Sequence, residues 1–153
     1  MRKSIPVFIA LAVLAAGGAA WASDTNTLTV TASVTGTCKF SSTTSSLDFG
    51  ALDPSNAVIV NGSASTQFWC TKGVTTDVMT AGNGGHHNGT SRQMAGPGGD
   101  LIPYSLTLSP VAGANAGPAS PRTLNIAGSV QAADYTSKAA GSYSDTVTLS
   151  ITP

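Results

Sequence analysis

Two adjacent histidines are the residues of this sequence best suited to chemistry. His86 and His87 lie within residues 81–100, a stretch rich in glycine and almost free of apolar side chains. Imidazole is a good ligand for zinc or copper. A metal site needs three or four rigidly held ligands, however, and no third candidate lies near the pair in the sequence. The pattern therefore predicts no metal centre, but a surface loop that tolerates shortening.

Acidic, hydroxyl and glycine residues form no local catalytic motif. The carboxylates are all aspartates, and no two of them have a catalytic spacing: Asp24, Asp48, Asp53, Asp77, Asp100, Asp134 and Asp145. Carboxylates distant in sequence can still meet in a fold, so this argument covers local spacing alone. The serines lack a Gly-x-Ser-x-Gly elbow, and the glycines lack the lysine and following helix of a phosphate loop. We predict no catalytic residue, no cofactor and no enzymatic activity.

The only two cysteines, Cys38 and Cys70, are expected to form a disulfide. In an exported chain an isolated pair favours a disulfide, and the alternative is two separate thiols. In the chain-entropy model, closing a loop of this length stabilises the fold by ~3.7 kcal/mol.

The first 22 residues have the pattern of a cleaved signal peptide. Arg2 and Lys3 precede an uncharged apolar run at residues 5–16, and Ala20-Trp21-Ala22 offers a cleavage site after Ala22. The alternative is a membrane anchor, for which the run is near the lower length limit. Cleavage predicts an exported chain of 131 residues (153 minus 22), which is enough for one domain.

Charge is scarce in this chain. Cleavage would remove two of the seven basic residues and leave five against seven acidic ones. With no basic cluster, the sequence argues against a nucleic-acid partner.

Apolar and polar residues alternate with a period of two at the start of the mature chain. Leu28, Val30, Ala32 and Val34 alternate with threonine and serine, which predicts a strand with one apolar face.

Further short strands are expected along the rest of the chain. They fall at residues 37–40, 47–50, 57–60, 64–70, 74–78, 102–108, 124–130 and 143–151. Residues 57–60 are apolar at consecutive positions, which predicts burial on both sides. Asn61-Gly62 predicts a hairpin and Lys72-Gly73 a turn. Pro103 predicts an edge strand or a bulge, and Gly128 a bulge.

Seven or eight short strands at this spacing predict an all-β antiparallel sandwich. Trp69 and Tyr104 could stack on a sugar, but such residues more often fill a sandwich core.

Several motifs occur in an order that resembles a known family. Thr-Gly-Thr-Cys38 and Leu47-Asp48-Phe49-Gly50 are followed by Cys70-Thr71-Lys72-Gly73. Arg92-Gln93-Met94 and the run from Leu101 to Leu106 come next, and the chain closes on Gly141-Ser142-Tyr143-Ser144-Asp145-Thr146-Val147. Over essentially the whole mature chain this resembles the spore coat protein U domain family, the secreted pilins of the archaic chaperone–usher pathway.

The resemblance implies an incomplete immunoglobulin-like sandwich that lacks one strand and is completed by strand donation. A periplasmic chaperone would fill the gap first, and at an outer-membrane usher the N-terminal segment of an identical or related subunit would replace it. Residues 23–36 would then be the donor segment, with Leu28, Val30, Ala32 and Val34 as its apolar row, and residues 37–153 the pilin-type domain. Thr107, Pro153 and the glycine-rich loop depart from the family pattern.

The expected function is that of a structural subunit of a surface fibre or coat, serving adhesion or biofilm formation. Export through the periplasm and no stable membrane anchor after cleavage follow from the same interpretation. Two alternatives remain, a self-complemented adhesive or carbohydrate-binding sandwich and a small secreted enzyme.

Overall fold

The computed structural model describes residues 23–75 and 77–153, so the expected signal peptide lies outside the described residues. The chain divides into two units, one ending at Ser33 and the other covering Val34–Pro153. Residues 23–37 have neither helix nor strand. The strand expected from their alternation is therefore not formed within the single chain, because a strand needs a neighbouring backbone to pair with.

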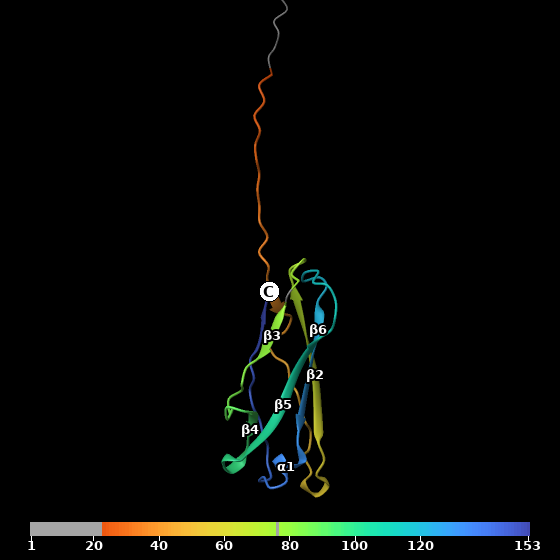
Figure 1. The fold of residues 1–153 in the computed structure, drawn as a ribbon, viewed down its shortest axis with the longest axis vertical. Helices are drawn as coiled ribbons and strands as arrows, with labels where there is room; N and C mark the ends of the chain where they lie inside the picture. Colours follow the sequence, from red (N-terminus) through yellow and green to blue (C-terminus); the bar gives the residue numbers. More distant parts are fainter. Residues whose placement is uncertain (1–22, 76) are drawn as a thin grey trace, which may run out of the picture. The chain divides into compact units, whose positions relative to one another are not determined.

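The described residues of the second unit form seven antiparallel strands (Figure 1). They are β1 Cys38–Phe40, β2 Val60–Cys70, β3 Val78–Ala81, β4 Arg92–Ala95, β5 Leu101–Pro110, β6 Arg122–Val130 and β7 Leu149–Thr152. Strands β1-β2-β6-β5-β4 form one sheet in that order, and β3 and β7 form a second. The helical parts are one turn, α1 Ala132–Tyr135, and two 3₁₀ turns, Pro54–Asn56 and Pro97–Gly99. The expected all-β sandwich is confirmed.

The core lies between the two sheets and follows the alternation of the strands. Phe68 on β2 and Leu124 and Ile126 on β6 are buried, and Met79 of β3 and Ile151 of β7 pack against them. A second cluster at the other end joins three buried residues, Ile102, Val130 and Tyr135. Because successive strand side chains point to opposite faces, one face of each strand is enough to build this core.

Two expectations based on glycine are wrong. Strand β2 runs straight through Asn61-Gly62 without a hairpin, and Gly128 pairs in regular register with Gly62, without a bulge. The glycines are needed for space: a Cβ at Gly62 would lie 2.8 Å from the Leu47 side chain, and one at Gly128 would lie 2.9 Å from the Phe49 ring. A missing side chain can therefore indicate close packing as well as a turn.

Residues 47–50 and 57–60 also differ from expectation. Residues 47–50 form no strand, although the expected turn is present at Gly50, where φ is +69° and the backbone N–H donates to Asp48. Val58 and Ile59 are about half exposed, at 51% and 55%, and are not buried on both sides. The Tyr135 hydroxyl bonds to both the N–H and the carbonyl of Val58 and occupies its backbone groups at this edge.

The glycine-rich stretch at residues 81–100 is more structured than expected. Strand β4 lies inside it and pairs with the first half of β5, while the second half of β5 pairs with β6. Pro103 lies in the half that pairs with β4 alone, as expected for an edge position. The last strand begins later than expected, since β7 starts at Leu149 and residues 143–148 make one isolated bridge, Ala95 to Ser144.

Candidate functional site

An open groove of about 600 Å³ lies over the inner face of the five-stranded sheet. Its floor includes Thr66 of β2, Leu106 of β5 and Ile126 of β6. One wall is the segment that follows β1, residues 42–49, which we call the N-terminal rim. The other wall is residues 143–149, the C-terminal rim, which reaches the opposite edge of the sheet through the Ala95–Ser144 bridge to β4. The groove therefore separates two segments attached to opposite edges of one sheet.

Both rims have backbone groups without a strand partner. In the described part of the chain, residues 43–49 and 145–147 make no backbone–backbone hydrogen bond. Ser144 exchanges two such bonds with Ala95, and the Thr148 carbonyl accepts from Gly82, so these residues bond on the side away from the groove. Successive residues of a strand point their N–H and C=O groups to opposite edges, which leaves those of Asp145 and Val147 facing the groove. Such rims are open edges to which another strand can add.

Apolar side chains on the floor and walls are only half covered. Phe40, Leu47, Leu106 and Leu149 line the groove and pack against the core while remaining partly exposed. Apolar surface of this kind loses free energy when it is removed from water, at roughly 25 cal/mol per Å². The groove is therefore suited to the apolar face of a strand.

The buried carboxylate of Asp145 joins the C-terminal rim to its surroundings. The Tyr104 hydroxyl donates to Oδ2 at 2.6 Å, and the N–H groups of Gly85 and Thr146 donate to Oδ1 at 2.8 Å each. Nδ1 of His86 lies 3.8 Å from Oδ1, and the Asp145 side chain is only 3% exposed. The carboxylate thus links the floor, the rim and the loop at residues 82–91, which we call the glycine loop.

Charge on this carboxylate is favoured by its partners. Burial raises the pKa of Asp145, but the hydrogen bonds from Tyr104, Gly85 and Thr146 and the nearby His86 together lower it below its ordinary value. Burial, followed by the hydrogen bond to Asp145, raises the pKa of Tyr104. At neutral pH the pair is therefore a phenol donating to a carboxylate.

The closing motif Gly141-x-Tyr143-x-Asp145 has a structural explanation. The Tyr143 hydroxyl donates to the Ala139 carbonyl at 2.7 Å, and a Cβ at Gly96 would collide with the Tyr143 ring. A Cβ at Gly141 would collide in the same way with Pro97. The motif residues hold the start of the C-terminal rim against the turn between β4 and β5. Sequence reasoning quoted this motif but missed the role of Asp145.

The histidines lie outside the groove lining. His86 faces Asp145, and Nδ1 of His87 accepts from the N–H of Gly89 at 3.1 Å. Within residues 23–75 and 77–153, no three His, Cys, Asp or Glu side chains gather as metal ligands.

The two aromatic residues considered for sugar binding do not form one platform. Trp69 of β2 pairs with Lys39 of β1. Its side chain lies on the face of the sheet opposite to Phe68 and the core. Tyr104 shares the inner face with Ile102 and Leu106 and lines the groove. Since neighbouring strand positions alternate between faces, the register places Trp69 and Tyr104 on opposite faces of the sheet.

The expected disulfide between Cys38 and Cys70 is present in the structure. The two cysteines are paired residues of β1 and β2, with their Cα atoms 4.0 Å apart. Beside them, the Thr71 hydroxyl accepts from the N–H of Thr37 at 3.0 Å and donates to its carbonyl at 3.3 Å. The disulfide and Thr71 therefore fix the point where the chain enters β1.

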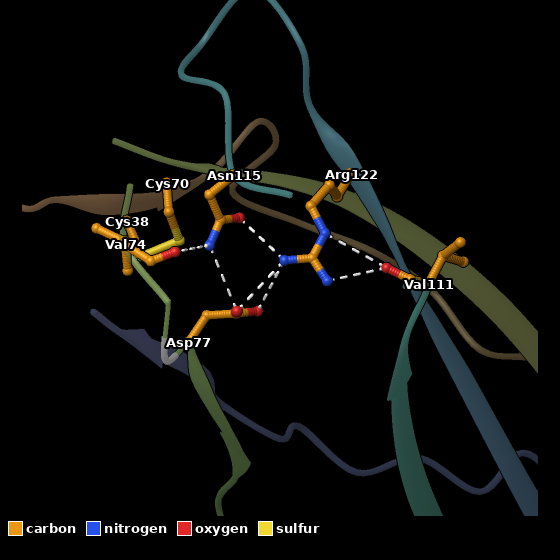
Figure 2. A network of polar contacts seen from close by, with 7 residues as sticks. All are labelled: Cys38, Cys70, Val74, Asp77, Val111, Asn115 and Arg122. Atoms are coloured by element: carbon orange, nitrogen blue, oxygen red, sulfur yellow. Dashed lines mark hydrogen bonds and ion pairs between the residues drawn. A yellow bond between two sulfur atoms is a disulfide. The ribbon is translucent and has the colours of Figure 1, made fainter. Parts of the chain in front are cut away.

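A polar network missed by sequence reasoning lies next to the disulfide (Figure 2). Nη1 of Arg122 donates to both oxygens of Asp77 at 3.3 Å and to Oδ1 of Asn115 at 2.9 Å. Nη2 of Arg122 donates to the Val111 carbonyl at 2.9 Å, and the guanidinium lies 5.0 Å from the centre of the Phe68 ring. The network ties the loop between β5 and β6 to the segment before β3.

The expected donor row is exposed to solvent. Leu28, Val30 and Val34 are 83%, 82% and 86% exposed, and Ala32 is exposed as well. Exposed apolar side chains are unfavourable in water, so burying this row against a partner would be favourable in free energy.

The fold and the groove define a class of protein, the β-sandwich domain with an uncovered groove. A family model, the Spore Coat Protein U domain, matches residues 24–150, and the chain belongs to this family. The family is one of secreted surface or coat proteins of pilin type and is consistent with a fimbrial or coat subunit role. No curated protein matches the chain significantly. Among the described residues, no helix has the length and apolar character needed to cross a membrane.

Proposed function

We propose that this protein is a structural subunit of a surface fibre or coat that polymerises by donor-strand exchange. The observation that carries the proposal is the groove with two unpaired rims over a half-covered apolar floor. A strand placed there would bond to open backbone edges and cover apolar side chains, the two sources of affinity in strand addition.

The donor segment, residues 23–36, has the features that the groove requires. Its row Leu28, Val30, Ala32 and Val34 points to one face of an extended strand. Residues 28–34 and residues 143–149 of the C-terminal rim are equal in number and would each extend ~20 Å, which matches the two in length. Burying each Leu or Val side chain contributes ~1.5–3 kcal/mol, so the row supplies several kcal/mol per joint.

The family assignment suggests where the strands come from. The chain would be exported by the N-terminal signal peptide, held in the periplasm by a chaperone that fills the groove, and polymerised at an outer-membrane usher into a fibre that serves adhesion or biofilm formation. Each donor segment would enter the groove of an identical or related subunit. This order avoids leaving an open strand edge in solution, which would promote aggregation.

The oligomeric size of the extracted protein distinguishes this proposal from a self-complemented adhesive domain. Protein extracted from the cell surface should run as a ladder of multimers in denaturing gels without heating and as a monomer after boiling. Periplasmic protein should elute as a one-to-one complex with a chaperone. A homogeneous monomer in both fractions would contradict donor-strand polymerisation and favour the self-complemented domain.

A further inference from the structure

The glycine loop, residues 82–91, is fastened at its base and near its middle. Nε of Arg92 donates to the Gly82 carbonyl at 2.7 Å, and Nη2 donates to the Ala81 carbonyl at 2.9 Å. Further along, the N–H of Gly85 donates to the Asp145 carboxylate, which His86 also faces. The sequence predicted a loop that could be shortened without loss, whereas these contacts join it to a wall of the groove.

We infer that the docked glycine loop is a latch that controls whether the groove can accept a strand, with Asp145 as the positioning residue. The inference rests on the proposed function and adds a regulatory element to it. A subunit with an undocked loop would still offer its own donor segment to a neighbour. It would fail as an acceptor.

The contacts of Asp145 explain how the latch acts. Its carboxylate holds the Thr146 N–H through Oδ1 and the floor residue Tyr104 through Oδ2, so the rim backbone is fixed from two directions. Gly85 completes the arrangement from the loop. Ladder hydrogen bonds need N···O distances of about 2.7–3.2 Å, so a rim that drifts by ~1 Å no longer matches an incoming strand.

Two glycines of the loop provide a matched pair of substitutions. Gly84 and Gly89 both have left-handed backbones, with φ of +82° and +90°, so alanine strains the backbone similarly at either place. A Cβ at Gly84 would collide with the Asp145 carboxylate, whereas a Cβ at Gly89 would have no atom within 4 Å beyond its two chain neighbours. Only Gly84→Ala should therefore displace the loop from Asp145.

The test uses full-length subunits with one or the other substitution. Hydrogen exchange of the purified subunit should be faster at Gly85 and Thr146, whose N–H groups donate to Asp145, in Gly84→Ala than in Gly89→Ala. The two tagged variants, each co-expressed with wild-type subunits, should also differ in the positions that they occupy in the multimers. Gly89→Ala should occupy internal positions of the multimers, and Gly84→Ala should be found only at chain ends, joined to one neighbour through its donor segment.

Equal exchange rates and equal internal incorporation of the two alanine variants would overturn the latch. If Gly84→Ala fails to fold, Asp145→Asn and Asp145→Ala replace it. Asn can keep the Oδ1 contacts and donate to Tyr104 in place of Oδ2, so it should incorporate internally, while Ala should not. Equal internal incorporation of Asn and Ala would also refute the latch. If wild-type subunits form no multimers, the proposed function fails, and the exchange comparison alone decides the latch.

Discussion

Val30→Asp is the substitution that most directly tests the donor row. Val30 lies near the middle of the row and is 82% exposed in the single chain, so the change should leave the subunit's own fold intact. In the proposed joint the same side chain enters the apolar groove of the next subunit, where a carboxylate has no partner. The variant should therefore fold and bind its chaperone, but fail to join a fibre as a donor.

The expected loss can be worked from two contributions. Removing the buried valine forfeits ~2 kcal/mol. Desolvating an unpaired carboxylate costs several kcal/mol after relaxation, of which we count ~3 kcal/mol. Together they weaken the joint by ~5 kcal/mol, which corresponds to more than ~1,000-fold in the association constant. A loss of this size should keep the variant from acting as a donor in multimers that survive extraction.

Thr29→Asp is the matched control, because its side chain points to the opposite face of the same strand. The two variants should accumulate equally in the periplasm as chaperone complexes, measured by affinity purification and gel filtration. In surface extracts, Thr29→Asp should give the wild-type ladder, and Val30→Asp should be absent or present only as a terminal acceptor. Degradation of Val30→Asp in the periplasm would refute the reasoning, because it would mean that Val30 supports the fold of its own chain.

Three further predictions concern the stability of the subunit. Replacing Cys38 and Cys70 by serine should lower the free energy of unfolding by ~3.7 kcal/mol in chemical denaturation, and intact protein should contain no thiol that alkylates before reduction. Because the pKa of Asp145 is lowered below its ordinary 3.8 in the folded state, the carboxylate stabilises the fold above about pH 4. That contribution is lost at lower pH, so the melting temperature should fall less between pH 6 and pH 3 in Asp145→Asn than in the wild type. Arg122→Ala leaves Asp77 and its neighbours without their donor and should destabilise the subunit by about 2–3 kcal/mol, with Arg122→Lys intermediate.

Strands with regular alternation could be predicted from the sequence, because period-two burial is a local property. The strands expected at residues 64–70 and 124–130 lie within β2 and β6, and their buried side chains alternate along each strand. The hairpin predicted at Gly62 and the bulge predicted at Gly128 were wrong, since a turn and a close contact both favour a residue without a side chain. The positions of the Leu47 side chain and the Phe49 ring separate the two explanations, and those positions depend on the fold.

The groove could be anticipated only through the family resemblance. Its walls come from residues 42–49 and 143–149, about a hundred positions apart, and local patterns give no information on which segments face each other. The Asp145 contacts are similarly distant, since Gly85 and Tyr104 approach the carboxylate from two other elements. The signal for Asp145 was its place in the closing motif, which indicated importance but not the partners.

A subunit that keeps a groove open until a partner arrives must be stable without that partner. The half-covered side chains of the groove contribute less than a closed core would, and the rims are the parts expected to open first. The disulfide and the Arg122 network are both located at the end where the chain enters β1, so the strongest fixed contacts lie beside the root of the donor segment. In the proposed assembly, strand addition would stabilise the folded state by mass action, because only the folded subunit has the groove. In the proposed fibre, assembly would supply the stability that the open groove costs the single subunit, so each joint would contribute to folding as well as to the fibre.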